Sequence, residues 1–145
     1  MSNIIEKLNV YLADLNVMYR KVQNYHWNVD GRNFFTIHAK LEEYYDEINE
    51  NIDSIAERIL SIKGKPYETM KKYREITNIK EANDKDITDL DLVKVLKKDF
   101  ETLLGEVKEI KEAADEANDY GTSAMMDELI IGYEKKLWML EAFLK

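Results

Sequence analysis

Apolar residues recur along most of this chain at alternating intervals of three and four positions. This spacing follows one face of an α-helix, so each run predicts a helix with one buried stripe. Only five Gly and one Pro occur in 145 residues, so few positions break a helix. The four runs are Ile5, Leu8, Leu12, Leu15, Tyr19, Val22 and His26; His38, Leu41, Tyr45, Ile48, Ile52, Ile55, Ile59 and Ile62; Val93, Leu96, Phe100, Leu103, Val107, Ile110, Ala114 and Ala117; and Met126, Ile130, Tyr133, Leu137, Leu140 and Leu144. We therefore expect one all-α domain over residues 1–145, a four-helix bundle that needs no strands.

Turn-forming residues predict where these helices end. Residues 30–33 separate the first two helices, residues 64–66 end the second, and residues 120–123 separate the last two. Thr88 followed by Asp91 has the form of a capping box, which predicts the start of the third helix.

The connection between the second and third helices, residues 63–87, is about 25 residues long, which is too long for a hairpin. A connection of this length runs along a bundle and leaves the helices on either side of it parallel. Within it, apolar residues at helical spacing over residues 67–79 predict a short extra helix on the outside. One long crossover in a four-helix chain indicates a ferritin-like topology.

Composition excludes several kinds of function. Acidic residues number 29 against 21 basic ones, a formal net charge of -8 that disfavours binding to phosphate backbones. The absence of cysteine excludes disulfides, thiolate metal sites and a cysteine nucleophile. The start of the sequence lacks the pattern of a secretory signal, and its longest uncharged run, residues 22–29, is too short to cross a membrane. We expect a cytoplasmic protein without a membrane segment.

Five side chains are candidates for metal binding. His26 and His38, the two histidines of the chain, flank the first turn, so antiparallel pairing of the helices brings them together. Glu42 lies one turn after His38, and Asp53 and Glu57 form a second four-residue pair on the same helix. The two acidic groups are separated by about 16 Å along the helix axis. Because metal ligands approach to about 2 Å, one chain cannot close such a site.

A second copy of the chain can close it. Positions 38 and 57 share a midpoint with positions 42 and 53, so two copies of this helix crossing antiparallel bring the two acidic groups together. We predict two equal sites in a two-fold dimer, each with His26, His38 and Glu42 from one chain and Asp53 and Glu57 from its partner. Such ligands suit non-haem iron, with manganese, zinc and cobalt as competitors. The simpler interpretation is a buried structural histidine and a solvated acidic face.

Two further features restrict the chemistry. Neither histidine has a glutamate three residues before it, so the Glu-x-x-His motif of di-iron sites within a bundle is absent from the sequence. Trp27 follows His26 directly, and it is interpreted either as a packing residue at the helix end or as a redox-active neighbour of the site.

Taken together, several segments of the sequence resemble the Dps family of miniferritins. The ligand spacings of 12, 4, 11 and 4 match the ferroxidase pattern of that family, and the similarity covers essentially the whole chain. One departure is Glu42, where family members more often have aspartate. The segments are His26-Trp27-Asn28-Val29, Gly31, Asn33-Phe34-Phe35, His38, Glu42, Asp53, Ala56-Glu57-Arg58, Lys65-Pro66 and Leu137-Trp138-Met139-Leu140.

The resemblance implies a hollow dodecamer that binds iron(II) at the dimer two-fold, oxidises it preferentially with hydrogen peroxide, and stores the iron(III) as mineral. It implies that the five candidate side chains are the iron ligands, and that Trp27 corresponds to an aromatic neighbour that intercepts radicals. It also implies an acidic iron-entry channel near the start of the fourth helix. Asp119 and Asp127 flank that start, with Asp115 and Glu116 nearby.

Some members of the family bind DNA through a basic tail, and we expect none in this protein. Only Met1, Ser2 and Asn3 precede the first predicted helix, and the net charge is negative. The leading interpretation is therefore an iron-oxidising and iron-storing enzyme. The alternatives are a DNA-compacting protein and a metal-free acidic helical scaffold.

Overall fold

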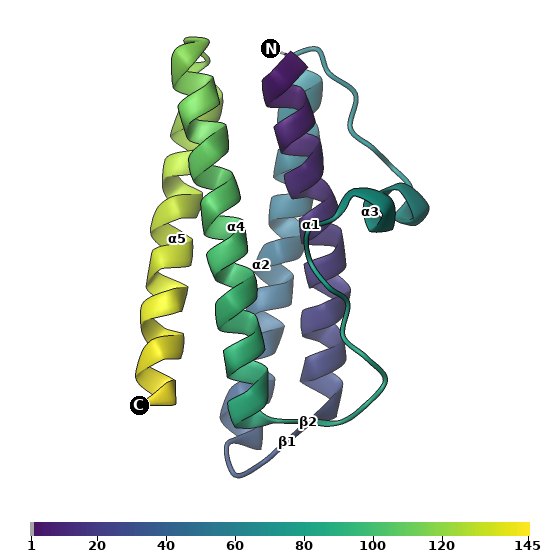
Figure 1. Ribbon diagram of the computed structural model, residues 1–145, viewed down its shortest axis with the longest axis vertical. Coiled ribbons are helices and arrows are strands. Elements are labelled where there is room, and N and C mark those ends of the chain that lie inside the picture. The colour runs from purple at the N-terminus through teal and green to yellow at the C-terminus, as the bar shows by residue number, and fades with distance from the viewer. Residues whose placement is uncertain (1) are drawn as a thin grey trace.

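The computed structural model describes residues 2–145, so Met1, the first residue of the expected domain, lies outside it. In chain order the elements are α1 (Ser2–Asn28), β1 (Val29–Asp30), α2 (Phe34–Ser61), α3 (Met70–Ile76), β2 (Ile87–Thr88), α4 (Asp89–Glu116) and α5 (Tyr120–Leu144). Figure 1 shows α1, α2, α4 and α5 as a bundle with α3 outside it. Among the described residues, no helix is sufficiently long and apolar to cross a bilayer.

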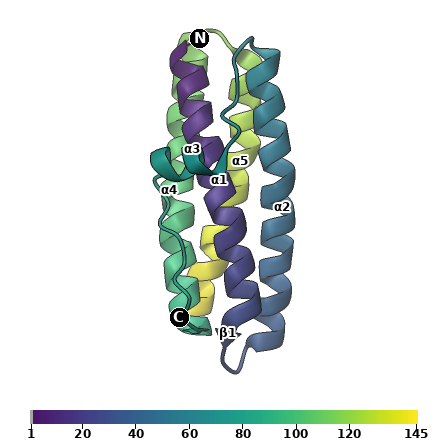
Figure 2. The same ribbon diagram turned by 90° about the vertical axis from the view of Figure 1, so that its right-hand side faces the viewer.

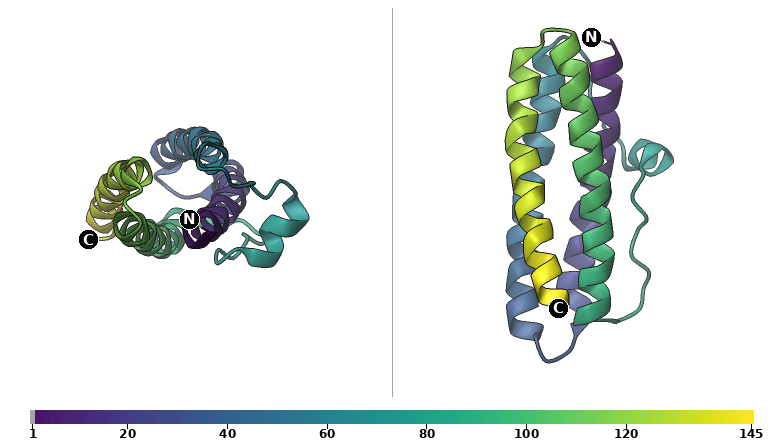
Figure 3. Two further views of the ribbon diagram at one scale, coloured as in Figure 1. Left: turned by 90° about the horizontal axis from the view of Figure 1, so that it is seen from above. Right: turned by 60° about the vertical axis from the view of Figure 1, so that its left-hand side comes forward.

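The four long helices form two hairpins joined by the crossover. From the end of α2 the chain passes along the outer side of α1 to the opposite end of the bundle, where α4 begins (Figures 1 and 2). Consequently α2 and α4 run in the same direction, as the length of the connection predicts. Seen along the bundle, α3 stands beside α1, away from the central core (Figure 3). The ferritin-like four-helix topology with one crossover is confirmed.

The predicted apolar stripes form most of the core, although Ala117 of the third stripe is exposed and Ile5 of the first is only partly buried. Leu12, Leu103 and Met126 are fully buried members of the first, third and fourth stripes. On α2, however, Tyr44 is buried while its neighbour Tyr45 is only half-buried. Two contacts explain the difference: Tyr44 packs edge-on against Phe100 of α4, with ring centroids 5.4 Å apart, whereas Tyr45 turns toward α1.

Beside the predicted helices, the structure contains one short pair of strands. The turn after α1 and the end of the crossover form a short parallel pair, with Val29 opposite Ile87 and Asp30 opposite Thr88. The two segments meet because the crossover returns to the end of the bundle where the first turn lies. Their paired backbone groups attach α4 to that turn, which local sequence patterns do not reveal.

Helix ends agree with the predictions at α4 but not at α5. The Thr88 hydroxyl accepts a hydrogen bond from the Asp91 N–H at 3.2 Å, which confirms the predicted cap. The last turn of the bundle lies at residues 117–119, not 120–123, because Asp119 caps α5 by accepting a bond from the Thr122 N–H. The preceding Asn118 takes a left-handed conformation (φ 57°) and so makes the turn itself. Gly121 therefore lies inside α5. The short extra helix is confirmed, but it spans Met70–Ile76.

Candidate metal centre

The two histidines lie against each other across the first turn, as their positions predict. His26 Nδ1 donates to the His38 carbonyl at 2.7 Å, and His38 Nδ1 donates to the His26 carbonyl at 2.7 Å. Their rings are stacked, with centroids 3.7 Å apart. A carbonyl only accepts hydrogen bonds, so each Nδ1 carries a proton, and in a neutral imidazole Nε2 is then the atom whose lone pair can bind a metal. Each imidazole is thus oriented as a metal ligand requires.

Glu42 and two aromatic rings surround this pair. Glu42 Oε1 lies 3.8 Å from His26 Nε2, so the carboxylate reaches the side of the ring that is free to bind a metal. Tyr45 packs edge-on against His26 at 5.3 Å, and Phe34 stacks on His38 at 5.0 Å. These contacts hold the imidazoles against rotation. The sequence did not predict this role for either aromatic residue. Helical spacing assigned Tyr45 to the core stripe, and it gave Phe34 no position in a stripe.

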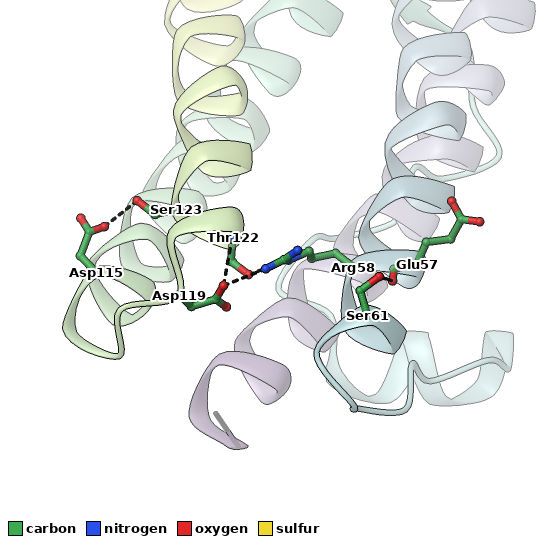
Figure 4. A network of polar contacts seen from close by, with 7 residues as sticks. All are labelled: Glu57, Arg58, Ser61, Asp115, Asp119, Thr122 and Ser123. Atoms are coloured by element: carbon green, nitrogen blue, oxygen red, sulfur yellow. Dashed lines mark hydrogen bonds and ion pairs between the residues drawn. The ribbon is translucent and has the colours of Figure 1, made fainter.

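Asp53 and Glu57 lie on the same helix as His38 and Glu42, with exposed side chains. Because α2 is one uninterrupted helix, the separation of about 16 Å between the two acidic groups persists in the fold. Figure 4 shows Glu57 pointing away from the polar cluster around Arg58, toward the outside of the subunit. Within residues 2–145, no three His, Cys, Asp or Glu side chains lie together closely enough to hold a metal ion.

Large apolar side chains are exposed next to the histidine pair. Trp27 is 56% exposed, with the Arg20 guanidinium 5.7 Å from its ring centre, and Phe35 is 86% exposed. Apolar side chains exposed beside a polar half-site are typical of surfaces that another protein chain covers.

The predicted channel carboxylates both have cationic partners within the subunit. Asp119 Oδ1 accepts from the Arg58 guanidinium at 2.8 Å, which links α2 to the start of α5 (Figure 4). Burial opposes ionisation of Asp119, but the bonds from Thr122 and Arg58 outweigh it and hold its pKa below the ordinary value. Asp127 lies 2.8 Å from Lys111. The channel role of Asp119 and Asp127 stays a prediction.

A clamp that sequence reasoning missed holds the turn between the histidines. Asn33 precedes α2 at the capping position, yet its side chain makes no cap. Instead its side-chain amide and its backbone N–H both donate to Asp89 Oδ2, at 3.0 and 3.2 Å. These backbone and side-chain bonds from Asn33 lower the pKa of Asp89. The two residues are 56 positions apart, so no local signal predicts the contact.

Replacement of Gly31 by alanine should loosen this turn. Gly31 has φ 135°, and a Cβ there would lie 2.6 Å from Asp89 Oδ2, so Gly31→Ala should lower the free energy of unfolding by about 1–3 kcal/mol. Chemical unfolding followed by circular dichroism measures this. Gly105→Ala is the control, because nothing lies within 4 Å of its added Cβ, and it should stabilise α4 by about 0.5–1 kcal/mol. Equal effects of the two substitutions would contradict the tight packing at Gly31.

Comparison with known proteins identifies the class to which this fold and half-site belong. A family model of the ferritin-like domain matches residues 5–145, so the chain belongs to the ferritin-like family. The crystal structure of a DPS protein from Vibrio cholerae O1, described as a member of a broad superfamily of ferritin-like diiron-carboxylate proteins, is 39% identical with a TM-score of 0.95. The match covers 99% of this chain and 90% of that one.

Within the ferritin-like family the similarity is to Dps proteins. The "DNA protection during starvation protein" of Brevibacillus brevis is 46% identical over 138 residues, which are 95% of this chain and 92% of the relative. The crystal structure of a Dps protein from Bacillus brevis, 44% identical, has a TM-score of 0.96 and covers 99% of this chain and 96% of that one. The predicted Dps miniferritin membership is confirmed.

Proposed function

We propose that this protein is a ferroxidase that oxidises iron(II), preferentially with hydrogen peroxide, at sites shared between two subunits. It stores the iron(III) as mineral inside a hollow shell of subunits. The histidine pair carries the proposal: each ring is held through Nδ1 and keeps a free Nε2, with Glu42 at 3.8 Å from His26. Asp53 and Glu57 of the partner subunit complete the ligands. Membership of the Dps group supports iron as the substrate.

The proposed reaction balances without a radical product. Two iron(II) ions each lose one electron, hydrogen peroxide takes up both electrons and two protons, its O–O bond breaks, and two water molecules form. Because two electrons reach one peroxide, hydroxyl radical is not released. The exposed Trp27 beside His26 is proposed to intercept radicals that do arise, and Asp119 and Asp127 to line the iron entry.

The shared site requires at least a dimer. We propose a two-fold dimer within a dodecamer, in which the exposed Trp27 and Phe35 are covered by a neighbouring subunit. A net charge of -8 per chain opposes attraction to DNA, and this favours iron storage over DNA compaction. The cytoplasm stays the expected compartment.

The decisive test adds hydrogen peroxide in steps to the protein with anaerobic iron(II) and follows iron(III) by near-ultraviolet absorbance. We expect rapid oxidation, about two irons consumed per peroxide, and loss of the activity in Asp53→Ala/Glu57→Ala. The matched control is Glu68→Ala/Glu75→Ala, which removes two exposed carboxylates from the crossover outside the bundle and should oxidise iron at the wild-type rate.

Each contrary result points to a different error. Oxidation no faster than in buffer contradicts the ferroxidase proposal and leaves the metal-free scaffold. Full activity in Asp53→Ala/Glu57→Ala contradicts the ligand assignment alone. A stable complex with DNA in a gel-retardation assay, without iron oxidation, would favour the DNA-compacting alternative.

A further inference from the structure

A carboxyl pair lies between α1, α4 and the crossover, far from the histidines. Asp14 of α1 is 0% exposed, and its Oδ1 accepts bonds from the Thr77 hydroxyl at 2.6 Å and from the Asn78 backbone N–H at 2.7 Å. On α4, Glu106 Oε2 accepts from the Asn78 side-chain amide at 3.3 Å. Both carboxyl groups therefore attach the same point of the crossover to the bundle.

One oxygen atom of each carboxyl group in this pair is buried without a hydrogen-bond donor from residues 2–145. Asp14 Oδ2 and Glu106 Oε1 are buried, and neither has a hydrogen-bond partner among the described residues. The two carboxyl groups nevertheless lie close together, since both bind Asn78 and Asp14 is, after burial, the main cause that raises the pKa of Glu106. Burying an oxygen without a partner is unfavourable. One proton between the carboxyl groups satisfies both atoms, since it makes one of them a donor and the other its acceptor.

We propose that Asp14 and Glu106 form a buried binding site for a single proton, which Glu106 Oε1 carries and donates to Asp14 Oδ2, and that this proton fastens the crossover to the bundle. The hydrogen bonds decide which group carries it. Asp14 Oδ1 already accepts two bonds, the arrangement that a carboxylate favours, whereas Glu106 accepts one. Burial, and after it the Asp14 carboxylate, raise the pKa of Glu106 to about 9.

Among residues 2–145, the lysines near the pair do not supply a cation for a second negative charge. Lys21 lies 2.7 Å from Asp99, and Lys7 pairs with Glu109 at 3.9 Å, so both nearby lysines already have carboxylate partners. A metal ion would need further ligands, and no three metal-binding side chains cluster within residues 2–145. The titratable or charged groups around the pair are Glu6, Lys7, Tyr11 and Lys21 of α1, Glu47 of α2, Asp99 and Glu109 of α4, and Tyr133 of α5.

The proton makes attachment of the crossover depend on pH. When the crossover opens, Glu106 reaches water and regains its ordinary pKa of 4.5, whereas in the closed state its pKa is about 9. Between these values the closed state binds more protons, so rising pH favours opening by about tenfold per pH unit. Below pH 4.5 both states hold the proton and the dependence disappears.

Glu106→Gln tests the proposal because it reproduces the hydrogen bonds without titrating. Its amide can donate to Asp14 Oδ2 while its carbonyl accepts from Asn78. Asp14→Asn provides a second variant, since it supplies the donor from the opposite side and lets Glu106 ionise. Hydrogen exchange of the peptide around Asn78, corrected for intrinsic rates, reports opening.

In the wild type, protection should fall about a hundredfold from pH 6 to pH 8, and it should stay level in Glu106→Gln and Asp14→Asn. Glu112→Gln, which removes an exposed charge from the same helix, should keep the wild-type dependence. The same pH slope in Glu106→Gln as in the wild type would overturn the proposal. So would a rise in wild-type protection at pH 8 on addition of Mn²⁺ alone, because that would show a cation in place of the proton.

Discussion

Two inactive variants should restore iron oxidation when they assemble together. His26→Asn/His38→Asn removes both Nε2 atoms but keeps an amide donor where each Nδ1 donates to a backbone carbonyl. Asp53→Ala/Glu57→Ala removes the acidic pair. If each site combines two chains, a mixed dimer contains one intact site and one doubly damaged site. Random pairing makes half of the dimers mixed, so co-expression should recover about a quarter of the wild-type rate.

Differently tagged copies, purified on both tags in succession, establish that the chains have assembled together. The control is Asp53→Ala/Glu57→Ala co-expressed with itself under the two tags, which should stay inactive. No activity in the mixed assembly, with both parent variants folded, would show that each site takes all its ligands from one chain. Such a result contradicts the shared site without bearing on ferroxidase activity.

Lys21→Met should lower the free energy of unfolding more than the loss of any exposed ion pair of this protein. Lys21 and Asp99 form an ion pair at 2.7 Å, with side chains 4% and 12% exposed. Removing the lysine leaves a buried carboxylate without a counter-charge, which costs about 3–5 kcal/mol. Chemical unfolding at pH 7 measures it. Lys97→Met, which breaks the more exposed Lys97–Glu101 pair, should change stability by less than about 0.5 kcal/mol.

The pH dependence of this loss has a definite sign. Burial already raises the pKa of Asp99, although Lys21 counteracts it, so the variant should raise that pKa further. A folded-state pKa above the ordinary 3.8 means that stability decreases as pH rises above this value. Lys21→Met should therefore be least damaging in acid, and adding Asp99→Asn should recover most of the loss at pH 7. A loss independent of pH, unrelieved by Asp99→Asn, would show that lost packing causes it.

Most of the fold follows from the sequence, since helical periodicity is a local property. The four stripes, the Thr88 cap and the length of the crossover predict the helices and their topology correctly. The start of α5 could not be predicted from the sequence, because Gly121 suggests a turn but lies within the helix. A Cβ at that position would meet the Arg58 guanidinium at 2.6 Å, and Arg58 is distant in sequence.

The histidine half of the candidate site could also be predicted from the sequence. A short turn between antiparallel helices brings His26 and His38 together whatever the rest of the chain does. Their reciprocal bonds to each other's carbonyls need the exact relation of the two helices, which the Asn33–Asp89 clamp supports from α4. The acidic half is placed on α2 by sequence, but its role depends on a second chain.

The sequence by itself determined the helix faces, the crossover and the residue types of the half-site. Only the tertiary structure decided that α1 is buried on more than one side, because α3 and the crossover cover the face opposite the core (Figure 3). That cover places Asp14 and Lys21, polar residues outside the apolar stripe, in the interior. Their partners lie on α4 and the crossover, more than 60 positions away. Periodicity describes neighbours within one helix, whereas the burial and charge state of these groups depend on contacts that form only when the whole chain has folded.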